Sequence, residues 1–342
     1  MKIIILGCNA VSASLAENLA SENTDITLVD PDAEALRELK DRLDIGIAQG
    51  WPSHPDEINM VACQIAFSVF KTPKKICRLR SASYIAQDDL FRPDAIPLDV
   101  VISPELLVSN YIRRLIELPG SLQVLDFADG NAQVAVRAYY GGPLVGQEIR
   151  FLREHMPNVD ARVAAIFRRN RAITPEGSTV IEADDEVFFI AAPKNIKAVI
   201  SELRRMDRPY KRLIIAGGGN IGARLASALE ERYQVKVIEH NPDRCAYLSE
   251  FLNRAVVLNG ISSDKKLLQE EGIADTDVFL ALTNDDEANI MSSLLAKRLG
   301  ARKVMCLISN PAYVDLVQGG EIDIAISPQQ ASIGSLLTHI RK

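Results

Sequence analysis

The sequence predicts an α/β protein with two doubly wound parallel-sheet domains and a small α+β subdomain between them. Three observations predict this fold class. Residues 2–30 and 212–239 repeat one pattern: an apolar run, a turn, a helix and a second apolar run ending in an acid. A glycine-rich turn, GGGNIG, occupies 217–222 of the second copy. Residues 139–203 read instead as short strands, RVAAIFR and STVIEADDEVFFIA, with turn-rich connections and the helix NIKAVISELRRM.

The repeat continues along the chain and sets the expected domain boundaries. NMVACQIAF at 59–67 resembles NIMSSLLAK at 289–297, and LDVVISPELL at 98–107 resembles IDIAISPQQA at 322–331. We therefore expect a first domain over 1–120, a small subdomain over 121–206 and a second domain over 211–342. DRPYK at 207–211 is the expected linker.

The two copies differ in length. Between Gly260 and Asp286 the second copy has a helical segment and the buried-strand pattern VFLAL, whereas the first copy has only WPSHP before Asp56. About twenty residues are missing there, which is one helix–strand step of a βαβ series. The first domain thus lacks this step near Pro55–Asp56: either the natural domain is incomplete or the sequence omits a segment. We favour an omission, because a parallel sheet without that strand has unpaired edges.

Composition excludes several classes of protein. No run approaches eighteen apolar residues, the start is not a cleaved signal, and the net charge of −6 argues against a nucleic-acid partner. The five cysteines are scattered without a CxxC pair, which predicts free thiols in a reducing cytosol. The four histidines have no metal-ligand spacing, so we expect no metal site.

The turn after RLIIA fits GxGxxG between a strand and a helix. Gly217 permits the tight turn, Gly219 allows close approach of a pyrophosphate, and Gly222 permits close helix–strand packing. Glu239 ends the next strand, twenty-two residues after Gly217, where a carboxylate binds ribose hydroxyls and repels a 2′-phosphate. The second domain is therefore predicted to be Rossmann-like and to bind NAD(H) or ADP/ATP. Its candidate residues are Gly217, Gly218, Gly219, Asn220, Ile221, Gly222 and Glu239.

Two later loops of the second copy are expected to reach the same ligand. Asn259 and Gly260 follow the third strand, and Thr283, Asn284 and Glu287 follow the fourth. Ligands of open parallel sheets lie outside the carboxyl ends of the strands. Acidic residues also favour a helix start, so capping and ligand contact are equally good explanations of the TNDDE run.

The first copy has a degraded form of the glycine turn. Gly7, Asn9 and Ser12 stand at the three glycine positions, and Asp30 stands where Glu239 does. A nucleotide site and a purely structural turn both remain open. The candidate residues here are Gly7, Cys8, Asn9, Ala10, Val11, Asp30 and Arg80, the last as a phosphate ligand or a solvated cation.

Catalytic patterns are missing from the sequence. We find no His–Asp or Tyr–Lys constellation for hydride transfer and no GxxxxGK[ST] for ATP hydrolysis. A nucleotide site without catalytic residues predicts a sensor and not an enzyme. The alternatives are a soluble NAD-dependent oxidoreductase and a Rossmann-type redox-sensing transcription factor. The latter needs a basic recognition helix, and clusters such as RRNR at 168–171 are short.

These motifs together resemble the TrkA-type regulatory subunits of bacterial Trk potassium uptake, which are built from RCK (KTN) domains. The resemblance rests on the doubled unit and on GGGNIG, VKVIEHN, TNDDEANIMSSLLAKRLGA and YVDLVQGGEIDIAISPQQA. GGPLVG, RVAAIFR and ADDEVFF resemble the small C-terminal RCK subdomain, and a second such subdomain is absent after Lys342.

The resemblance implies a peripheral protein on the cytoplasmic face of the bacterial inner membrane. Its implied partner is a TrkH-type potassium-translocating membrane subunit, which it gates in response to a nucleotide. It also implies self-association into dimers and a tetrameric ring.

The segment 103–118 is amphipathic, and SPQQASIGSLLTHI is its counterpart in the second copy. Such crossover helices either exchange between the two domains or each packs on its own domain.

Overall fold

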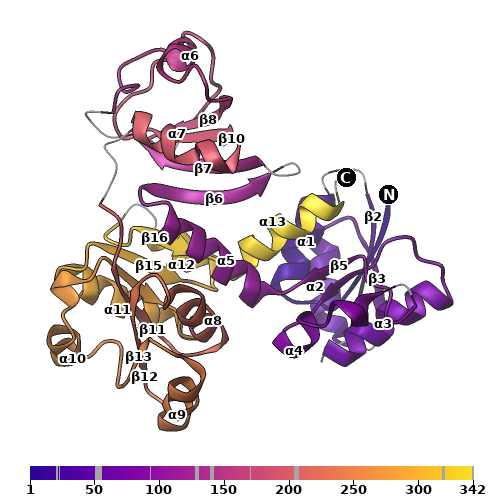
Figure 1. The fold of residues 1–342 in the computed structure, drawn as a ribbon. Helices are drawn as coiled ribbons and strands as arrows, with labels where there is room; N and C mark the ends of the chain where they lie inside the picture. The colour runs from indigo at the N-terminus through magenta and orange to yellow at the C-terminus, as the bar shows by residue number, and fades with distance from the viewer. Residues whose placement is uncertain are drawn as a thin grey trace. The chain divides into compact units, whose positions relative to one another are not determined.

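The fold is that of a computed structural model, which describes residues 1–20, 22, 24–50, 56–92, 94–127, 131–138, 142–169, 171–203, 208–317 and 320–340 (Figure 1). Its contacts divide the chain into two compact units. The first unit comprises Met1–Val108, Ile308–Val314 and Ile326–Lys342, and the second comprises Ser109–Leu307 and Asp315–Ala325. No helix of the described chain is long and apolar enough to cross a membrane.

The first lobe, which holds strands β1 to β5 between residues 2 and 102, begins with a βαβαβ series. Strands β1 (Lys2–Leu6), β2 (Asp25–Asp30) and β3 (Gly46–Gln49) form a parallel sheet in that order, connected by helices α1 (Ala10–Ala20) and α2 (Ala33–Arg42). Helix α3 (Asp56–Ser68) leads to a separate pair of parallel strands, β4 (Ile76–Arg78) and β5 (Val100–Ile102). Helix α4 (Ala82–Ile85) lies between these two strands in the sequence. Leu15, Leu19, Ile26, Leu28 and Leu36 form the core of the βαβαβ part.

The first sheet has an open edge at β1. Within the described chain β1 pairs only with β2, and its side chains Ile4 and Leu6 are 71% and 48% exposed. Helix α3 also exposes apolar side chains along one side, including Ile58, Val61 and Ile65. The predicted missing step falls next to residues 51–55, which lie outside the described residues.

The second lobe, which holds strands β11 to β16 between residues 212 and 326, has a continuous sheet. Its six strands lie in the order β13-β12-β11-β14-β15-β16. Neighbouring strands from β13 to β15 pair in parallel. The strands are β11 (Arg212–Ala216), β12 (Gln234–Glu239), β13 (Val256–Asn259), β14 (Val278–Ala281), β15 (Lys303–Leu307) and β16 (Ile324–Ile326). The helices are α8 (Asn220–Leu229), α9 (Pro242–Phe251), α10 (Lys265–Glu270), α11 (Asp286–Arg298) and α12 (Pro311–Val317), and the crossover helix α13 (Pro328–Ile340) follows them in sequence. Strand order reverses between β11 and β14, which is the position where open α/β sheets bind ligands.

The small subdomain is an antiparallel sheet in the order β6-β7-β10-β8-β9. Its strands are β6 (Ser121–Phe127), β7 (Asn131–Arg137), β8 (Ala161–Arg168), β9 (Arg171–Ile173) and β10 (Glu186–Ala191), and helices α6 (Leu152–His155) and α7 (Ile196–Leu203) accompany it. The predicted strand over 178–191 is shorter in the structure. Asp184 has φ +68°, and buried Asp185 accepts two hydrogen bonds from Arg168, so a turn replaces the first half of that strand.

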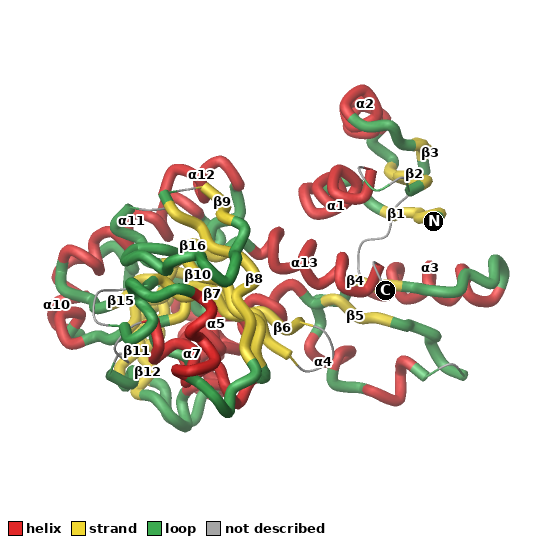
Figure 2. The backbone as a smooth tube through the Cα atoms, turned by 90° about the horizontal axis from the view of Figure 1, so that it is seen from above, coloured by secondary structure: helices red, strands yellow, loops and turns green. Residues whose placement is uncertain are grey.

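The crossover helix α13 packs in the first unit, although it follows the second lobe in sequence. It contacts α1 (Figure 1, Figure 2), and Leu336, Leu337 and Ile340 pack against the first-lobe core. Gln329 Nε2 donates to Ala10 O at 2.9 Å and to Ser14 Oγ at 2.6 Å. Its counterpart α5 (Pro104–Glu117) belongs to the second unit from Ser109 onward. This is the arrangement that exchanged crossover helices would produce.

Candidate nucleotide-binding site

The glycine turn between β11 and α8 needs its glycines for different reasons. Gly217 has φ +106°, and a Cβ there would lie 2.9 Å from the backbone of Leu282 and Thr283. A Cβ at Gly222 would lie 2.0 Å from the carbonyl oxygen of Gly217. At Gly219, in contrast, an added Cβ meets no atom within 4 Å. The first and last glycines therefore hold the turn together, and the middle one leaves open space before the helix.

The N-terminus of α8 faces that space without a side-chain cap. Gly219 is the N-cap residue and makes no side-chain hydrogen bond, because it has no side chain. The first N–H groups of a helix lack intrahelical acceptors and carry partial positive charge. An anion placed at this end would accept hydrogen bonds from them.

Glu239 is held beside the turn at the end of β12. It is 7% exposed, its Oε2 accepts from Gly218 N at 2.8 Å, and its Oε1 accepts from Asn241 N at 2.9 Å. His240 Nδ1 lies 2.9 Å from Oε1. The side chain of Arg244 completes the arrangement by donating to Gly218 O at 2.7 Å. These contacts fix the carboxylate against the second glycine of the fingerprint.

The structure brings the two later loops to the same sheet edge. Asn259 is the register partner of Glu239 and donates through Nδ2 to Glu239 O at 3.0 Å, and Gly260 N donates to the same oxygen at 2.9 Å. Thr283 adjoins Gly217 across the strand reversal. Asn284 lies in the turn before α11 and Glu287 lies in the first turn of that helix, and both are exposed.

Buried Asn289 is a residue that the motif analysis missed. Its Oδ1 accepts from Thr283 N at 2.9 Å and from Thr283 Oγ1 at 2.7 Å, and its Nδ2 donates to Leu307 O at 3.0 Å. Asn59, at the matching position of the repeat, donates to Arg78 O at 3.0 Å. The repeated NM/NI pair in the sequence was the available signal. Asp285 caps α11 by accepting from Ala288 N at 2.8 Å, so capping accounts for one acid of the TNDDE run.

The first lobe repeats the backbone of the turn. Gly7 has φ +101° and donates to Val29 O at 2.9 Å, as Gly217 donates to Ile238 O at 2.9 Å. Asp30 accepts from Cys8 N at 2.6 Å and from Asp32 N at 2.9 Å, which are the contacts that Glu239 makes. Burial and the charge of Asp30 raise the pKa of the Cys8 thiol, so it stays protonated.

The helix N-terminus of the first lobe is different, because side chains cap it. Asn9 Oδ1 accepts from Val11 N at 3.0 Å and from Ser12 N at 3.3 Å. Ser12 Oγ accepts from Asn9 N at 2.7 Å and donates to Asn9 O at 2.9 Å. Arg80 lies with its Nε 3.6 Å from Glu105 Oε1, and its backbone N donates to Asp56 Oδ2 at 2.9 Å. The N–H groups that are uncapped in α8 thus already have partners in α1.

Within the described ranges, no three His, Cys, Asp or Glu side chains are grouped so as to hold a metal ion. All five cysteines are free thiols, and Cys77 and Cys306 are buried.

Comparison with known proteins identifies the family. Residues 3–56 and 213–328 match the TrkA-N domain, and residues 134–204 match the TrkA-C domain. The chain is 61% identical to the Trk system potassium uptake protein TrkA of Halomonas elongata, over 100% of this chain and 79% of that protein. It is 55% identical to the TrkA of Vibrio alginolyticus, over 100% of this chain and 80% of that protein. The chain belongs to the TrkA family.

The relatives and solved structures also bear on the fold. The alignment with the Halomonas TrkA runs over 363 positions, whereas this chain has 342 residues, so at least 21 of those positions have no residue in this chain. The GsuK channel matches with a TM-score of 0.72 at 18% identity, covering 99% of this chain and 64% of that one. The GsuK RCK domain matches with a TM-score of 0.70 at 17% identity, covering 100% and 77%. This TrkA family member thus has the RCK fold, with Rossmann-like lobes.

Proposed function

We propose that this chain is a nucleotide-sensing regulatory subunit of a Trk potassium uptake system, and that NAD(H) or ADP/ATP binds the second lobe. One observation carries the proposal: an uncapped helix N-terminus at Gly219 lies beside a fixed carboxylate, Glu239, which bonds Gly218 N at 2.8 Å. Phosphates would accept from the first N–H groups of α8, and the ribose hydroxyls would donate to Glu239. The carboxylate would repel a 2′-phosphate, which favours NAD(H) or ADP/ATP over NADP.

Related folds support the nucleotide class. One GsuK channel structure is described as bound to NAD and matches with a TM-score of 0.69, and another is described as bound to ADP and matches with 0.58. Their identities to this chain are 17% and 15%.

The proposed partner is a TrkH-type membrane subunit at the cytoplasmic face of the inner membrane. A nucleotide gates such a partner only by binding two conformations of the regulatory subunit with different affinity. Self-association into dimers and a tetrameric ring would transmit that difference. The exposed apolar residues Ile58, Val61 and Ile65 of α3 support this assembly, because they form a helical stripe at i, i+3 and i+7. The likeness to a human SLO3 gating ring, with a TM-score of 0.54, agrees with a ring-forming fold.

We propose no catalytic residue. The TrkA relatives are named as potassium uptake components, and the oxidoreductase and transcription-factor alternatives would each need a group that the sequence does not supply.

The test compares substitutions of Glu239 and Asp30, the acidic residues that end the second strand of each lobe. Glu239→Ala should weaken binding of NAD⁺ or ADP by about tenfold to a hundredfold, because charge-assisted hydrogen bonds contribute about 1.5–3 kcal/mol. Potassium uptake by cells that depend on this subunit should lose its nucleotide dependence. Asp30→Ala is the matched control, and it should leave both nucleotide affinity and uptake unchanged. Nucleotide affinity that is the same in Glu239→Ala as in the parent protein would refute the proposed site.

A further inference from the structure

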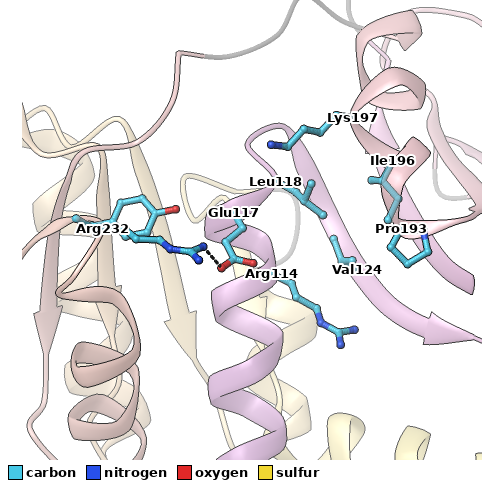
Figure 3. Close-up of a pocket in the computed structure, with 9 residues that line it drawn as sticks. Arg114, Glu117, Leu118, Val124, Pro193, Ile196, Lys197 and Arg232 are labelled. Carbon is cyan, nitrogen blue, oxygen red and sulfur yellow. Dashed lines mark hydrogen bonds and ion pairs between the residues drawn. The ribbon is translucent and has the colours of Figure 1, made fainter. Parts of the chain in front are cut away.

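The first unit places two cysteines on elements that pack against each other. Cys63 lies on α3, Cys77 lies in β4, and the helix packs on the strand. Cys77 is 2% exposed in a small apolar core, and Cys63 packs against that core while staying partly exposed. The pocket drawn in Figure 3 belongs to the second unit, and none of the described residues that line it is a cysteine. Solvent therefore reaches Cys63 far more easily than it reaches Cys77.

Two contacts on either side of Cys63 fix how α3 faces β4. Asn59, one helical turn before Cys63, donates through Nδ2 at 3.0 Å to the backbone carbonyl that follows Cys77. Phe67, one turn after Cys63, has its ring centroid 5.4 Å from Nζ of Lys75. Lys75 stands two residues before Cys77, and residues at this spacing share a strand face, as residues at i and i+4 share a helix face. Cys63 and Cys77 therefore lie opposite each other between these two contacts.

The surroundings favour Cys63 as the thiolate of the pair. A hydrogen bond from the Cys77 thiol and the charge of Lys75 lower the pKa of Cys63, although burial opposes them. The same hydrogen bond and burial raise the pKa of Cys77, so this thiol stays protonated. Lys75 is itself buried and held by an ion pair of Nζ with Asp99 Oδ2 at 2.7 Å. Since the thiolate is the nucleophilic form of cysteine, Cys63 is the residue that attacks an oxidant.

The second lobe has one thiol at the matching place. Ser293 stands there in the position of Cys63, by the alignment of the repeated helices. Cys306 stands in the position of Cys77, and both second-lobe residues are fully buried. A serine forms no disulfide, so the second lobe provides a control with the same packing and a single sulfur.

We propose that Cys63 and Cys77 are a peroxide-reactive dithiol, activated by Lys75, that closes to a disulfide between α3 and β4. In the first step the Cys63 thiolate attacks one oxygen of hydrogen peroxide, the O–O bond breaks, and the departing hydroxide takes a proton from solvent and leaves as water. Cys63 is then a sulfenic acid. In the second step the sulfur of Cys77 bonds to Cys63 Sγ, and its proton leaves with the sulfenic hydroxyl as a second water. Overall, two thiols are oxidised to one disulfide, and one peroxide is reduced to two waters.

The disulfide would hold α3 in one position on β4. Helix α3 carries the exposed apolar residues Ile58, Val61 and Ile65. An oxidised chain would therefore present this stripe on a fixed helix. Any effect on self-association rests on the proposed function, whereas formation of the disulfide does not.

Peptide mass spectrometry after oxidation tests the pair directly. The reduced full chain is treated with a small molar excess of hydrogen peroxide, and the remaining thiols are alkylated. Trypsin cuts between the two cysteines, so the disulfide appears as a link between peptides 43–71 and 76–78, lighter than their sum by two hydrogen atoms. We expect this link to be the main product, with Cys8, Cys245 and Cys306 still alkylated.

Substitutions separate the roles of the two thiols. Cys77→Ser should stop the reaction at the sulfenic acid of Cys63, which dimedone traps. Cys77→Ala gives the same test if the serine hydroxyl disturbs the core. Cys306→Ser makes the same change at the matching place in the second lobe, and it should form the disulfide at the parent rate.

The role of Lys75 is tested by the rate at which the Cys63 thiol is lost. Lys75→Gln should slow this loss about threefold to tenfold, because a rise of one pKa unit lowers the thiolate fraction up to tenfold. Lys74→Gln, which removes the charge of the exposed neighbouring lysine, is the matched control and should leave the rate unchanged.

Three results would overturn the proposal. The first is that both cysteines remain alkylated after peroxide has oxidised an equal concentration of free cysteine. The second is a disulfide that joins Cys63 of two chains, which a non-reducing gel shows as a dimer. The third is an equal rate in Lys75→Gln and Lys74→Gln. Unfolding curves that match the parent protein show that each variant is folded.

Discussion

In the first lobe, Val11 N and Ser12 N donate to the side chain of Asn9, whereas in the second lobe Gly219 offers the start of α8 no side chain at all. The backbones of the two turns otherwise match, down to a carboxylate that accepts from the second residue of the turn. The difference teaches that a turn can keep the shape of a nucleotide site while its own side chains occupy the donors that a phosphate would use.

The lobes also differ in how their central strand is covered. Ile214 in β11 is 2% exposed because β14 and β12 flank it, whereas the equivalent Ile4 in β1 is 71% exposed at an open edge. The second lobe is therefore a complete sheet that can hold a site rigidly, and the first is a partial one.

The largest expected effect tests this difference in burial. Ile214→Lys should cost more than about 4 kcal/mol of unfolding free energy, because it buries an unpaired charge. Ile4→Lys should change it by less than about 0.5 kcal/mol, because the side chain is already in water. Chemical denaturation measures both. A large loss for Ile4→Lys would show that something covers β1 in solution.

The next effect concerns the last position of the turn. Gly222→Ala places a Cβ 2.0 Å from Gly217 O, so the turn must shift, at a cost of about 2–3 kcal/mol and with loss of nucleotide binding. Ser12→Ala at the matching position removes only hydroxyl hydrogen bonds, at about 1 kcal/mol. Equal effects of the two substitutions on nucleotide affinity would contradict the division of roles between the lobes.

Glu230 in the second lobe should make a pH-dependent contribution to the free energy of unfolding. Burial opposes ionisation of Glu230, but the N–H groups of Arg254, Ala255 and Asn253 outweigh it and lower the pKa of this carboxyl. Its contribution is therefore present above the unfolded-state pKa of about 4.3 and is lost as pH falls through the lower folded-state value.

Glu230→Gln should accordingly cost about 2 kcal/mol at pH 7 and less near pH 3. Hydrogen exchange of residues 253–255 at the two pH values locates the loss. A cost that is the same at both pH values would show that the charge of Glu230 contributes nothing.

The smallest effect is expected when the second lobe is given the asparagine N-cap of the first lobe. Gly219→Asn should lower nucleotide affinity by about tenfold, because the new side chain competes with phosphate for the first N–H groups. Stability should change by only a few tenths of a kcal/mol. Gly219→Ala, which adds a Cβ in open space but no acceptor, is the control. If both variants bind equally well, capping does not distinguish the lobes.

Much of the second-lobe site follows from sequence, because each part depends on neighbours along one βαβ unit. The GxGxxG spacing and Glu239 at the next strand end predict a turn beside a carboxylate, and in the structure Glu239 Oε2 accepts from Gly218 N at 2.8 Å. That a nucleotide binds there stays a prediction. Asn289 could not be predicted from its type, because its role arises only when α11 returns to the sheet edge. The sequence likewise did not decide whether Asn9 caps α1, because Asn at that position equally suits an unusual backbone angle.

The number of nucleotides bound per chain tests the central claim most directly. Calorimetric titration of the full chain with NAD⁺ and with ADP should give one site, whose affinity falls about tenfold to a hundredfold in Glu239→Ala and is unchanged in Asp30→Ala. Two sites per chain, or a single site that depends on Asp30 and not on Glu239, would contradict the account, because the capped turn of the first lobe would then be the sensor.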